Sequence, residues 1–181
     1  MRRVLIAAIC LLAVSAGTAG ATSVGVSVFG GASIPIAQDD TGTGSQFGLR
    51  VPIGLPKLFT IEPYFARAKN GDAVANLGGQ DFTRSGFDVN TFGGNLILGS
   101  PGKGGMSFFP YVGLNRSKLE RVSTTTRTEL GFNLGLGLGF TIIPKLWVEG
   151  RGEVNMVTTD NTSRKYGNVN IGVGYNFYVG P

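Results

Sequence analysis

Residues 130–140 read LGFNLGLGLGF, and their alternation decides the fold class. Leucine or phenylalanine occupies every second position, and glycine or asparagine occupies the positions between. A period of two is the pattern of a β-strand whose two faces meet different surroundings. A tilted strand needs about ten residues to cross a bilayer. This segment is therefore long enough to span a membrane as a strand.

The same alternation recurs along the chain, most clearly at 169–179 and 46–53. Eight segments can be placed in this way, at roughly 23–31, 45–54, 58–68, 86–98, 107–118, 128–141, 145–157 and 167–179. In the fourth segment, Phe87 and Val89 are out of phase with Phe92 and the apolar residues that follow it. An extra residue in a strand shifts the phase in this manner, which predicts a β-bulge near Thr91.

The connections between these segments also alternate. Those after the second, fourth and sixth segments are short, at 55–57, 99–106 and 143–145. Those at the other end are mostly longer and polar, such as the stretches that begin at Asn70 and Thr158. Short turns at one end and long loops at the other are typical of outer-membrane barrels. The sequence thus predicts an all-β fold, an eight-stranded antiparallel up-and-down transmembrane β-barrel with both termini on the periplasmic side.

The chemistry of the two faces predicts which one meets lipid. A charged side chain facing hydrocarbon costs about 2–4 kcal/mol for arginine or lysine at the bilayer midplane. We therefore expect the bulky apolar face to point outward, with the glycines on the inner face leaving room for long polar neighbours. The polar residues expected to form a network in the lumen are Arg50, Glu62, Tyr64, Glu149, Arg151 and Glu153. Aromatic residues near the predicted strand ends are expected to form interfacial girdles; they are Phe47, Phe59, Phe65, Phe108, Phe140, Tyr175 and Phe177.

The N-terminus has the three parts of a cleavable signal peptide. Arg2 and Arg3 precede the apolar run 4–14, and Ala19-Gly20-Ala21 offers a small-residue cleavage site. We predict a signal peptide over 1–21 and one outer-membrane β-barrel domain over 22–181. The single cysteine, Cys10, falls within the predicted signal peptide.

Three stretches carry a resemblance to a known family: PYF at 63–65, PYV at 110–112 and the final NIGVGYNFYV at 170–179. With the predicted signal peptide, they resemble the small bacterial outer-membrane β-barrel family that includes OmpX, Ail and the OmpA transmembrane domain. The resemblance implies residence in the cell outer membrane of a Gram-negative-type bacterium. It also implies contact with outer-membrane lipids and lipopolysaccharide, and insertion by the barrel-assembly machinery. Family members usually end on the aromatic residue, whereas four residues follow Phe177 here.

Composition narrows the possible activities. The chain contains no histidine, which excludes histidine-dependent general-base catalysis and the usual Cys/His zinc sites. Without Arg2 and Arg3, 14 of the 16 basic residues remain, against 11 acidic residues. This excess of positive charge is mild and scattered along the chain, so it does not indicate a nucleic-acid partner. We predict a protein that is not an enzyme and needs no cofactor.

Function is then expected in the extracellular loops, with a structural or surface-interaction role in adhesion or envelope integrity. The residues that could contact a surface partner or lipopolysaccharide phosphates are Asp39, Asp40, Asp72, Asp81, Arg84, Arg164 and Lys165. Two alternatives stay open at this point. One is a narrow pore for small solutes, and the other is a soluble exported barrel that binds an apolar ligand inside.

Overall fold

A computed structural model describes residues 22–36, 41–56, 58–77, 80–102, 104–121, 124–158 and 163–179. The predicted signal peptide at 1–21 lies outside these ranges, so it stays a prediction.

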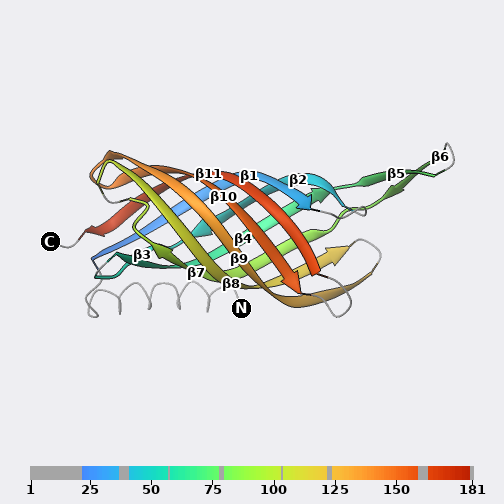
Figure 1. Cartoon of the computed structure of the whole chain (residues 1–181), viewed down its shortest axis with the longest axis horizontal. Helices are drawn as coiled ribbons and strands as arrows, with labels where there is room; N and C mark the ends of the chain where they lie inside the picture. The colour runs from blue at the N-terminus through green and yellow to red at the C-terminus, as the bar shows by residue number, and fades with distance from the viewer. Residues whose placement is uncertain are drawn as a thin grey trace.

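The chain forms a closed antiparallel β-barrel (Figure 1). The strands are β1 (Ser23–Ile36), β2 (Gly42–Arg50), β3 (Ile53–Gly54), β4 (Phe59–Gly71), β5 (Ala73–Leu77), β6 (Gln80–Arg84), β7 (Asp88–Leu98), β8 (Met106–Arg121), β9 (Thr124–Ile143), β10 (Leu146–Thr158) and β11 (Ser163–Val179). Each barrel strand pairs with its neighbour along the chain, and β11 pairs with β1 to close the cylinder. Because β3 continues the path of β2, and β5 and β6 form a separate hairpin, the barrel has the eight strands that the sequence predicts.

One predicted strand is interrupted. The segment 45–54 is divided at Val51 and Pro52 into β2 and β3, both of which pair with β1 and β4. Proline has no backbone N–H to donate to a ladder. The carbonyl of Pro52 still accepts a hydrogen bond from the Gly25 amide, at 3.0 Å, where the pairing of β1 with β11 shifts register between Val24 and Gly25.

The predicted bulge near Thr91 is absent. The pairing of β7 with β4 and with β8 runs without a shift through this residue. Val89 is out of phase because it points into the lumen, where it packs against Leu119, Val157 and Tyr166. The phase of the apolar residues changes along β7 because the lumen itself becomes apolar at this level.

The two ends of the barrel differ, although not in the way that the loop lengths suggested. At one end lie the connections from β3 to β4, from β7 to β8 and from β9 to β10, together with the start of β1 and the end of β11 (Figure 1). At the other end, much of what the sequence indicated as loop is strand. Strand β8 runs to Arg121 and β9 begins at Thr124, while β5 and β6 form a hairpin that projects beyond the barrel. Threonine-rich sequence such as 124–128 favours an extended backbone, so the ladder continues past the apolar residues.

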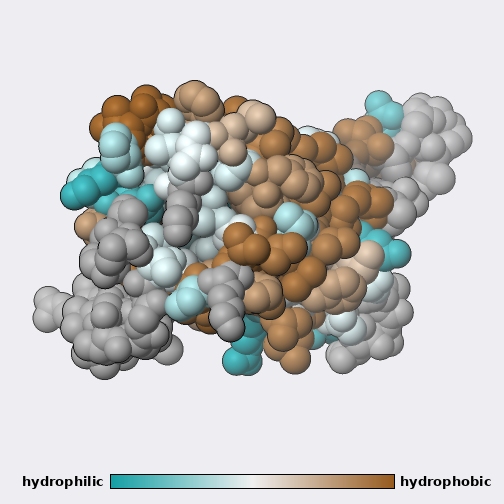
Figure 2. Space-filling view, turned by 60° about the vertical axis from the view of Figure 1, so that its left-hand side comes forward, coloured by the Kyte–Doolittle hydropathy of each residue, from teal (hydrophilic) through white to brown (hydrophobic). Residues whose placement is uncertain are grey.

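The outer surface carries the apolar residues. On β9 the residues from Leu130 to Ile142 alternate between exposed apolar side chains and inward residues, which are buried glycine or asparagine up to Gly139 and half-buried Thr141 after it. At about 3.4 Å per residue and a strand tilt of about 40°, this outward stretch spans about 30 Å, the thickness of a bilayer core. Figure 2 shows hydrophobic residues over much of the visible flank and hydrophilic ones mostly toward the ends. The expected orientation of the faces is therefore confirmed.

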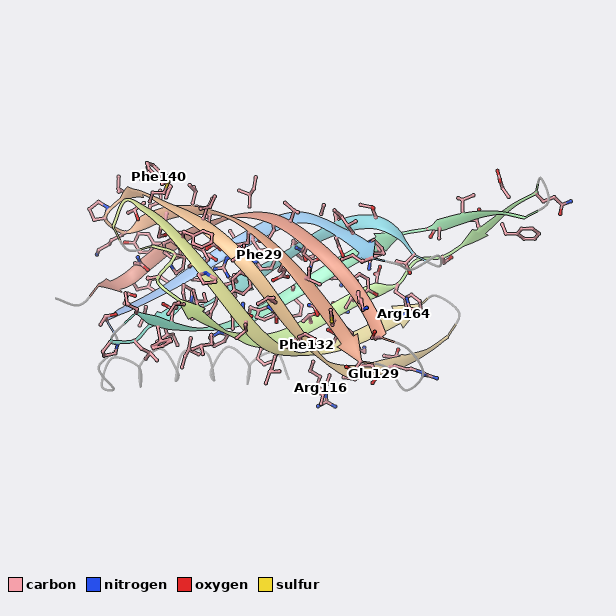
Figure 3. The ribbon with its side chains drawn as sticks, in the orientation of Figure 1. Phe29, Arg116, Glu129, Phe132, Phe140 and Arg164 are labelled. Atoms are coloured by element: carbon pink, nitrogen blue, oxygen red, sulfur yellow. The ribbon has the colours of Figure 1, made fainter. Side chains whose placement is uncertain are left out.

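Aromatic side chains lie toward both ends of this apolar band. All seven aromatic residues expected in girdles are exposed on the outer surface. Phe92 and Phe132 add to the group at the extracellular side, and Figure 3 places Phe132 and Phe140 toward opposite ends of the barrel. Aromatic rings at both interfaces are typical of transmembrane barrels.

Candidate functional site

The interior of the barrel is arranged in layers, and strand β10 crosses all of them. Its buried or half-buried inward residues, taken from the turn end outward, are Trp147, Glu149, Arg151, Glu153, Asn155 and Val157. The order is therefore aromatic, ionic, amide and apolar. An eight-stranded barrel has an interior just wide enough for side chains to fill.

The ionic layer joins two arginines to two glutamates. The two terminal nitrogens of Arg151 donate to the two carboxylate oxygens of Glu62 at 2.7 and 2.6 Å, and Nη2 also contacts Glu149 Oε2 at 2.9 Å. Arg50 Nη1 donates to Glu149 Oε1 at 3.0 Å. These four side chains are at most 3% exposed. The structure thus brings together four of the six residues proposed for the lumen network, in a geometry that places each charge beside an opposite one.

Aromatic rings inside the barrel contact the two guanidinium groups of this ionic layer. The guanidinium of Arg50 lies 3.6 Å from the ring centroid of Phe29, and that of Arg151 lies 5.0 Å from Phe109 and 5.2 Å from Tyr111. A positive charge over an aromatic face is stabilised by the ring quadrupole.

Inward glycines make room for these rings. Tyr111 pairs with Gly135 across β8 and β9, and a Cβ on Gly135 would overlap the tyrosine ring. Trp147 and Gly174 form the same arrangement on β10 and β11. The glycines were expected to accommodate long polar side chains. Gly135 and Gly174 accommodate aromatic rings instead, whereas Gly113 and Gly131 face asparagine side chains and Gly172 faces Glu149, as expected. The sequence signal for the aromatic packing is an aromatic residue on one predicted strand that lies opposite a glycine on the next.

Tyr64 and Glu153 belong to the next layer, which is rich in amides. Glu153 accepts hydrogen bonds from Tyr111 at 2.9 Å and from Asn168 at 2.9 Å, and the Tyr64 hydroxyl donates to Asn133 at 3.4 Å. Buried asparagines continue the chain of contacts, through Asn95, Asn133, Asn115 and Asn155. These asparagines do not stand out in the sequence, because asparagine is also common in turns.

An apolar cluster, here called the outer plug, lies above the amides. Its buried members are Val89, Leu119, Val157 and Tyr166, with Ala68 and Phe87 packed against them. The cavity between the plug and the amide layer has a volume of about 20 Å³. A space of this size holds about one water molecule. The lumen is therefore filled at this level rather than open to a solute.

The residues predicted for the extracellular loops are placed differently from one another. Asp72 is exposed and accepts a hydrogen bond from the Gly86 amide at 3.1 Å, which ties the two ends of the β5–β6 hairpin together. Asp81 is exposed on β6, and Arg84 is also a strand residue rather than a loop residue. Asp39 and Asp40 lie outside the described residues.

Arg164 and Lys165 were expected in a loop, which is wrong. Both lie in β11, where they pair with Val157 and Met156 of β10. The guanidinium of Arg164 is 4.0 Å from the ring of Phe87, at the edge of the outer plug. The strand begins earlier than the sequence suggested because the ladder with β10 continues to Ser163.

Basic residues also gather on the outer surface just beyond the extracellular aromatic residues. Arg67 pairs across the sheet with Phe47, and Arg116 pairs with Phe92. Lys69 and Lys118 follow one alternation further outward on β4 and β8. We call Arg67, Lys69, Arg116 and Lys118 the basic belt; Arg116 points away from the barrel in Figure 3. Two neighbouring carboxylates partly balance it, since Arg67 contacts Asp88 at 3.5 Å and Lys118 pairs with Glu120.

In the described parts of the chain, no helix is both long and apolar enough to cross a membrane. Within the same residues, no group of three or more histidine, cysteine, aspartate or glutamate side chains is arranged to hold a metal ion.

Comparison with known proteins adds a family and a set of similar folds. The profile of the outer membrane protein β-barrel domain matches residues 5–177. The Neisserial surface protein A structure is 15% identical, with a TM-score of 0.65, and the match covers 87% of this chain and 99% of that one. The N-terminal β-barrel domain of Pseudomonas aeruginosa OprF is 16% identical, with a TM-score of 0.57 and coverage of 87% and 99%.

A third similar structure is Ail, the attachment invasion locus protein of Yersinia pestis. It is 16% identical, with a TM-score of 0.52, and the match covers 86% of this chain and 99% of that one. No curated protein sequence matches this chain significantly. At these identities the likeness to solved structures concerns the fold.

Proposed function

Because the chain belongs to the outer membrane protein β-barrel domain family, we propose that it is a non-catalytic surface barrel whose extracellular strand extensions mediate adhesion or envelope integrity. The observation that carries the proposal is the contrast between a filled lumen and a protruding sheet. The ionic layer and the outer plug occupy the interior, while β5–β6 and the ends of β8 and β9 extend past the apolar band. The sequence contains no histidine, so catalysis that depends on histidine is excluded.

The extensions supply the surface for a partner. The β5–β6 hairpin carries exposed apolar side chains, with Val74 64% and Phe82 52% exposed. Exposed apolar residues on a protruding ribbon favour contact with another molecule. A structural neighbour is named for attachment and invasion, which agrees with a surface role for this architecture.

Outer-membrane lipids and lipopolysaccharide are the proposed partners around the barrel wall. The basic belt stands at the level where the extracellular aromatic residues end, so its cations are suitably placed for lipid phosphates. We also propose that the barrel-assembly machinery inserts the chain. In the final strand, whose sequence resembles the family, Tyr175 and Phe177 contact each other edge to face on the outer surface, with ring centroids 5.7 Å apart.

The soluble alternative required the bulky apolar face to point inward. The structure has that face outward, with exposed fractions of 47% to 73% for Leu130, Phe132, Leu134, Leu136 and Leu138. A barrel with an apolar outer surface of this size would not stay in water as a free monomer.

The pore alternative leads to a conductance prediction. Purified protein inserted in a planar bilayer is expected to show no steady ion conductance, because the Arg151–Glu62–Glu149–Arg50 cluster and the outer plug both block the axis. Single-channel recording is the measurement, with a known porin as positive control. Stable unit conductance from most inserted molecules would favour the transport role instead.

The surface role leads to a second prediction, made on the hairpin. Replacing residues 73–84 by a short turn should leave the barrel folded, because β5 and β6 pair only with each other. Cells that carry this variant are expected to lose adhesion to host-cell or matrix surfaces while their detergent resistance stays at the wild-type level. If the variant instead adheres normally and the complete gene deletion sensitises cells to detergent, the role is envelope integrity. If neither property depends on the gene, the proposed function is wrong.

A further inference from the structure

The connection from β7 to β8 enters the mouth of the barrel at the turn end. We call its residues 99–102 and 104–105 the strap. Pro101 is less than 2% exposed and Gly102 is buried, although both belong to a connection between strands. Connecting segments usually run over the surface of a protein. The buried middle therefore distinguishes the strap from an ordinary turn.

The strap closes over an aromatic residue of the lumen. A Cβ added to Gly102 would lie 2.7 Å from Cε3 of Trp147, so the backbone of the strap is in contact with the indole ring. The ring also contacts the wall, because a Cβ on Gly25 of β1 or on Gly174 of β11 would overlap it as well. Trp147 is 1% exposed. The strap therefore forms the turn-end side of the enclosure that keeps this ring from water.

Both ends of the strap are anchored, and both have glycines that can act as hinges. At the first end, the Gly99 amide donates to the Leu58 carbonyl at 2.6 Å, and the Thr60 hydroxyl donates to the Gly99 carbonyl at 2.7 Å. At the second end, the Thr141 amide donates to the Gly105 carbonyl at 2.8 Å. Gly99 and Gly105 have φ angles of 115° and 62°, a region that glycine enters without steric cost. The backbone can therefore turn at these points while the anchors hold.

Hydrogen bonding near the middle of the strap both favours and opposes closure. The side-chain amide of Asn176 donates to the Gly102 carbonyl at 3.1 Å, which holds the strap in the mouth. Beside the second end of the strap, Ser107 Oγ and Thr141 Oγ1 are buried without a hydrogen-bond partner among the described residues. A buried hydroxyl without a partner costs free energy that contact with water would recover. Access of water on opening would therefore offset part of the loss of the Asn176 bond.

The strap also has space beside it. A pocket of about 270 Å³ is lined by residues of the strap and of the connection from β3 to β4. Ser100 and Ser107 line it together with Leu55, Leu58 and Phe59. The strap can move toward this pocket without displacing a strand of the barrel.

We propose that the strap is a hinged cap, which opens at the turn end while the barrel stays folded and thereby admits water to Trp147. Its hinges are Gly99 at one end and Gly104 and Gly105 at the other. The hydrogen bonds that hold the strap involve none of the four side chains of the ionic layer. Opening of the strap therefore wets the aromatic residue next to the mouth but leaves the lumen closed to ions. The inference is independent of the proposed surface role.

The test measures how strongly acrylamide quenches the fluorescence of Trp147, the single tryptophan, in the folded protein in detergent micelles. In Gly102→Ala the added methyl group overlaps an indole ring that the wall holds in place, so the strap has to yield. Asn176→Ala removes the hydrogen bond to the strap without adding bulk. The matched control is Ser100→Ala, because Ser100 belongs to the same strap but lines the pocket. A band that changes its migration on heating shows for each variant that the barrel has folded.

Wild-type Trp147 is expected to be quenched weakly, through transient opening of the strap. Gly102→Ala and Asn176→Ala should each raise the quenching constant about fivefold, the effect of roughly one lost hydrogen bond on an equilibrium. Ser100→Ala should behave as the wild type. Wild-type quenching in both folded variants would overturn the proposal, and so would an equal increase in Ser100→Ala. Loss of the folded band in both variants would also overturn it, because the strap and the barrel would then unfold together.

Discussion

Replacing Arg151 with methionine is expected to destabilise the barrel by about 3–5 kcal/mol, the usual cost of removing one partner from a buried ion cluster. Arg151 is 3% exposed and donates to both Glu62 and Glu149. Without it, two buried carboxylates share the single guanidinium of Arg50. Urea unfolding of the protein in lipid vesicles, followed by the fraction of folded band on unheated gels, measures the change in the free energy of unfolding.

Two further variants separate the loss of charge pairing from the loss of packing. In the double variant Glu62→Gln/Arg151→Met, the Arg50–Glu149 pair stays intact and the second carboxylate is neutral. This variant should therefore be more stable than Arg151→Met alone. Arg116→Met, on the exposed basic belt, should change stability by no more than about 0.5 kcal/mol. Equal stability of the Arg151 and Arg116 variants would contradict a structural role for the ionic layer.

Leucine at position 137 is expected to prevent folding of the barrel. Gly137 pairs with Phe109 across β8 and β9, and even a Cβ at this position would overlap the phenylalanine ring. Phe109 is fully buried and lies against Arg151, so its ring has no free space to move into. Overpacking in a dense core commonly costs 1–3 kcal/mol, and a leucine here adds four carbons. The heat-modifiable band of a refolded sample should be lost.

The Gly94→Leu variant is the control for strand propensity, because its side chain would point outward into open space. It should fold as the wild-type protein does. The double variant Phe109→Ala/Gly137→Leu makes room inside and should recover part of the folded band. Loss of folding in Gly94→Leu, or normal folding of Gly137→Leu, would show that the inward and outward assignments are wrong.

Period-two alternation was sufficient to predict the barrel and its orientation. In 130–140 bulky apolar residues alternate strictly with small or polar ones. The two faces of the strand can therefore be told apart before its neighbouring strands are known. The charged residues Arg50, Glu62, Glu149 and Arg151 are rare enough in these strands to stand out as inward-facing. Their mutual contacts follow from the narrow diameter of an eight-stranded barrel.

Other features could not be predicted because they depend on which strands meet. Val89 seemed to mark a bulge, since an apolar side chain pointing inward is unexpected until Leu119, Val157 and Tyr166 are known to surround it. The extensions of β8 and β9 use polar, threonine-rich sequence that also suits loops, so only their pairing identifies them as strands. The buried asparagines gain their meaning from one another, through hydrogen bonds that join different strands.

The central claim is an apolar exterior in contact with lipid around a polar, filled interior. The single tryptophan, Trp147, is 1% exposed and points inward, whereas Leu138 is 57% exposed and points outward. The most direct test is tryptophan fluorescence in vesicles whose lipids carry bromine near the middle of the acyl chains. Native Trp147 emission should be largely retained, and the emission added by Leu138→Trp should be strongly quenched. Strong quenching of Trp147 with an unquenched tryptophan at position 138 would contradict the account.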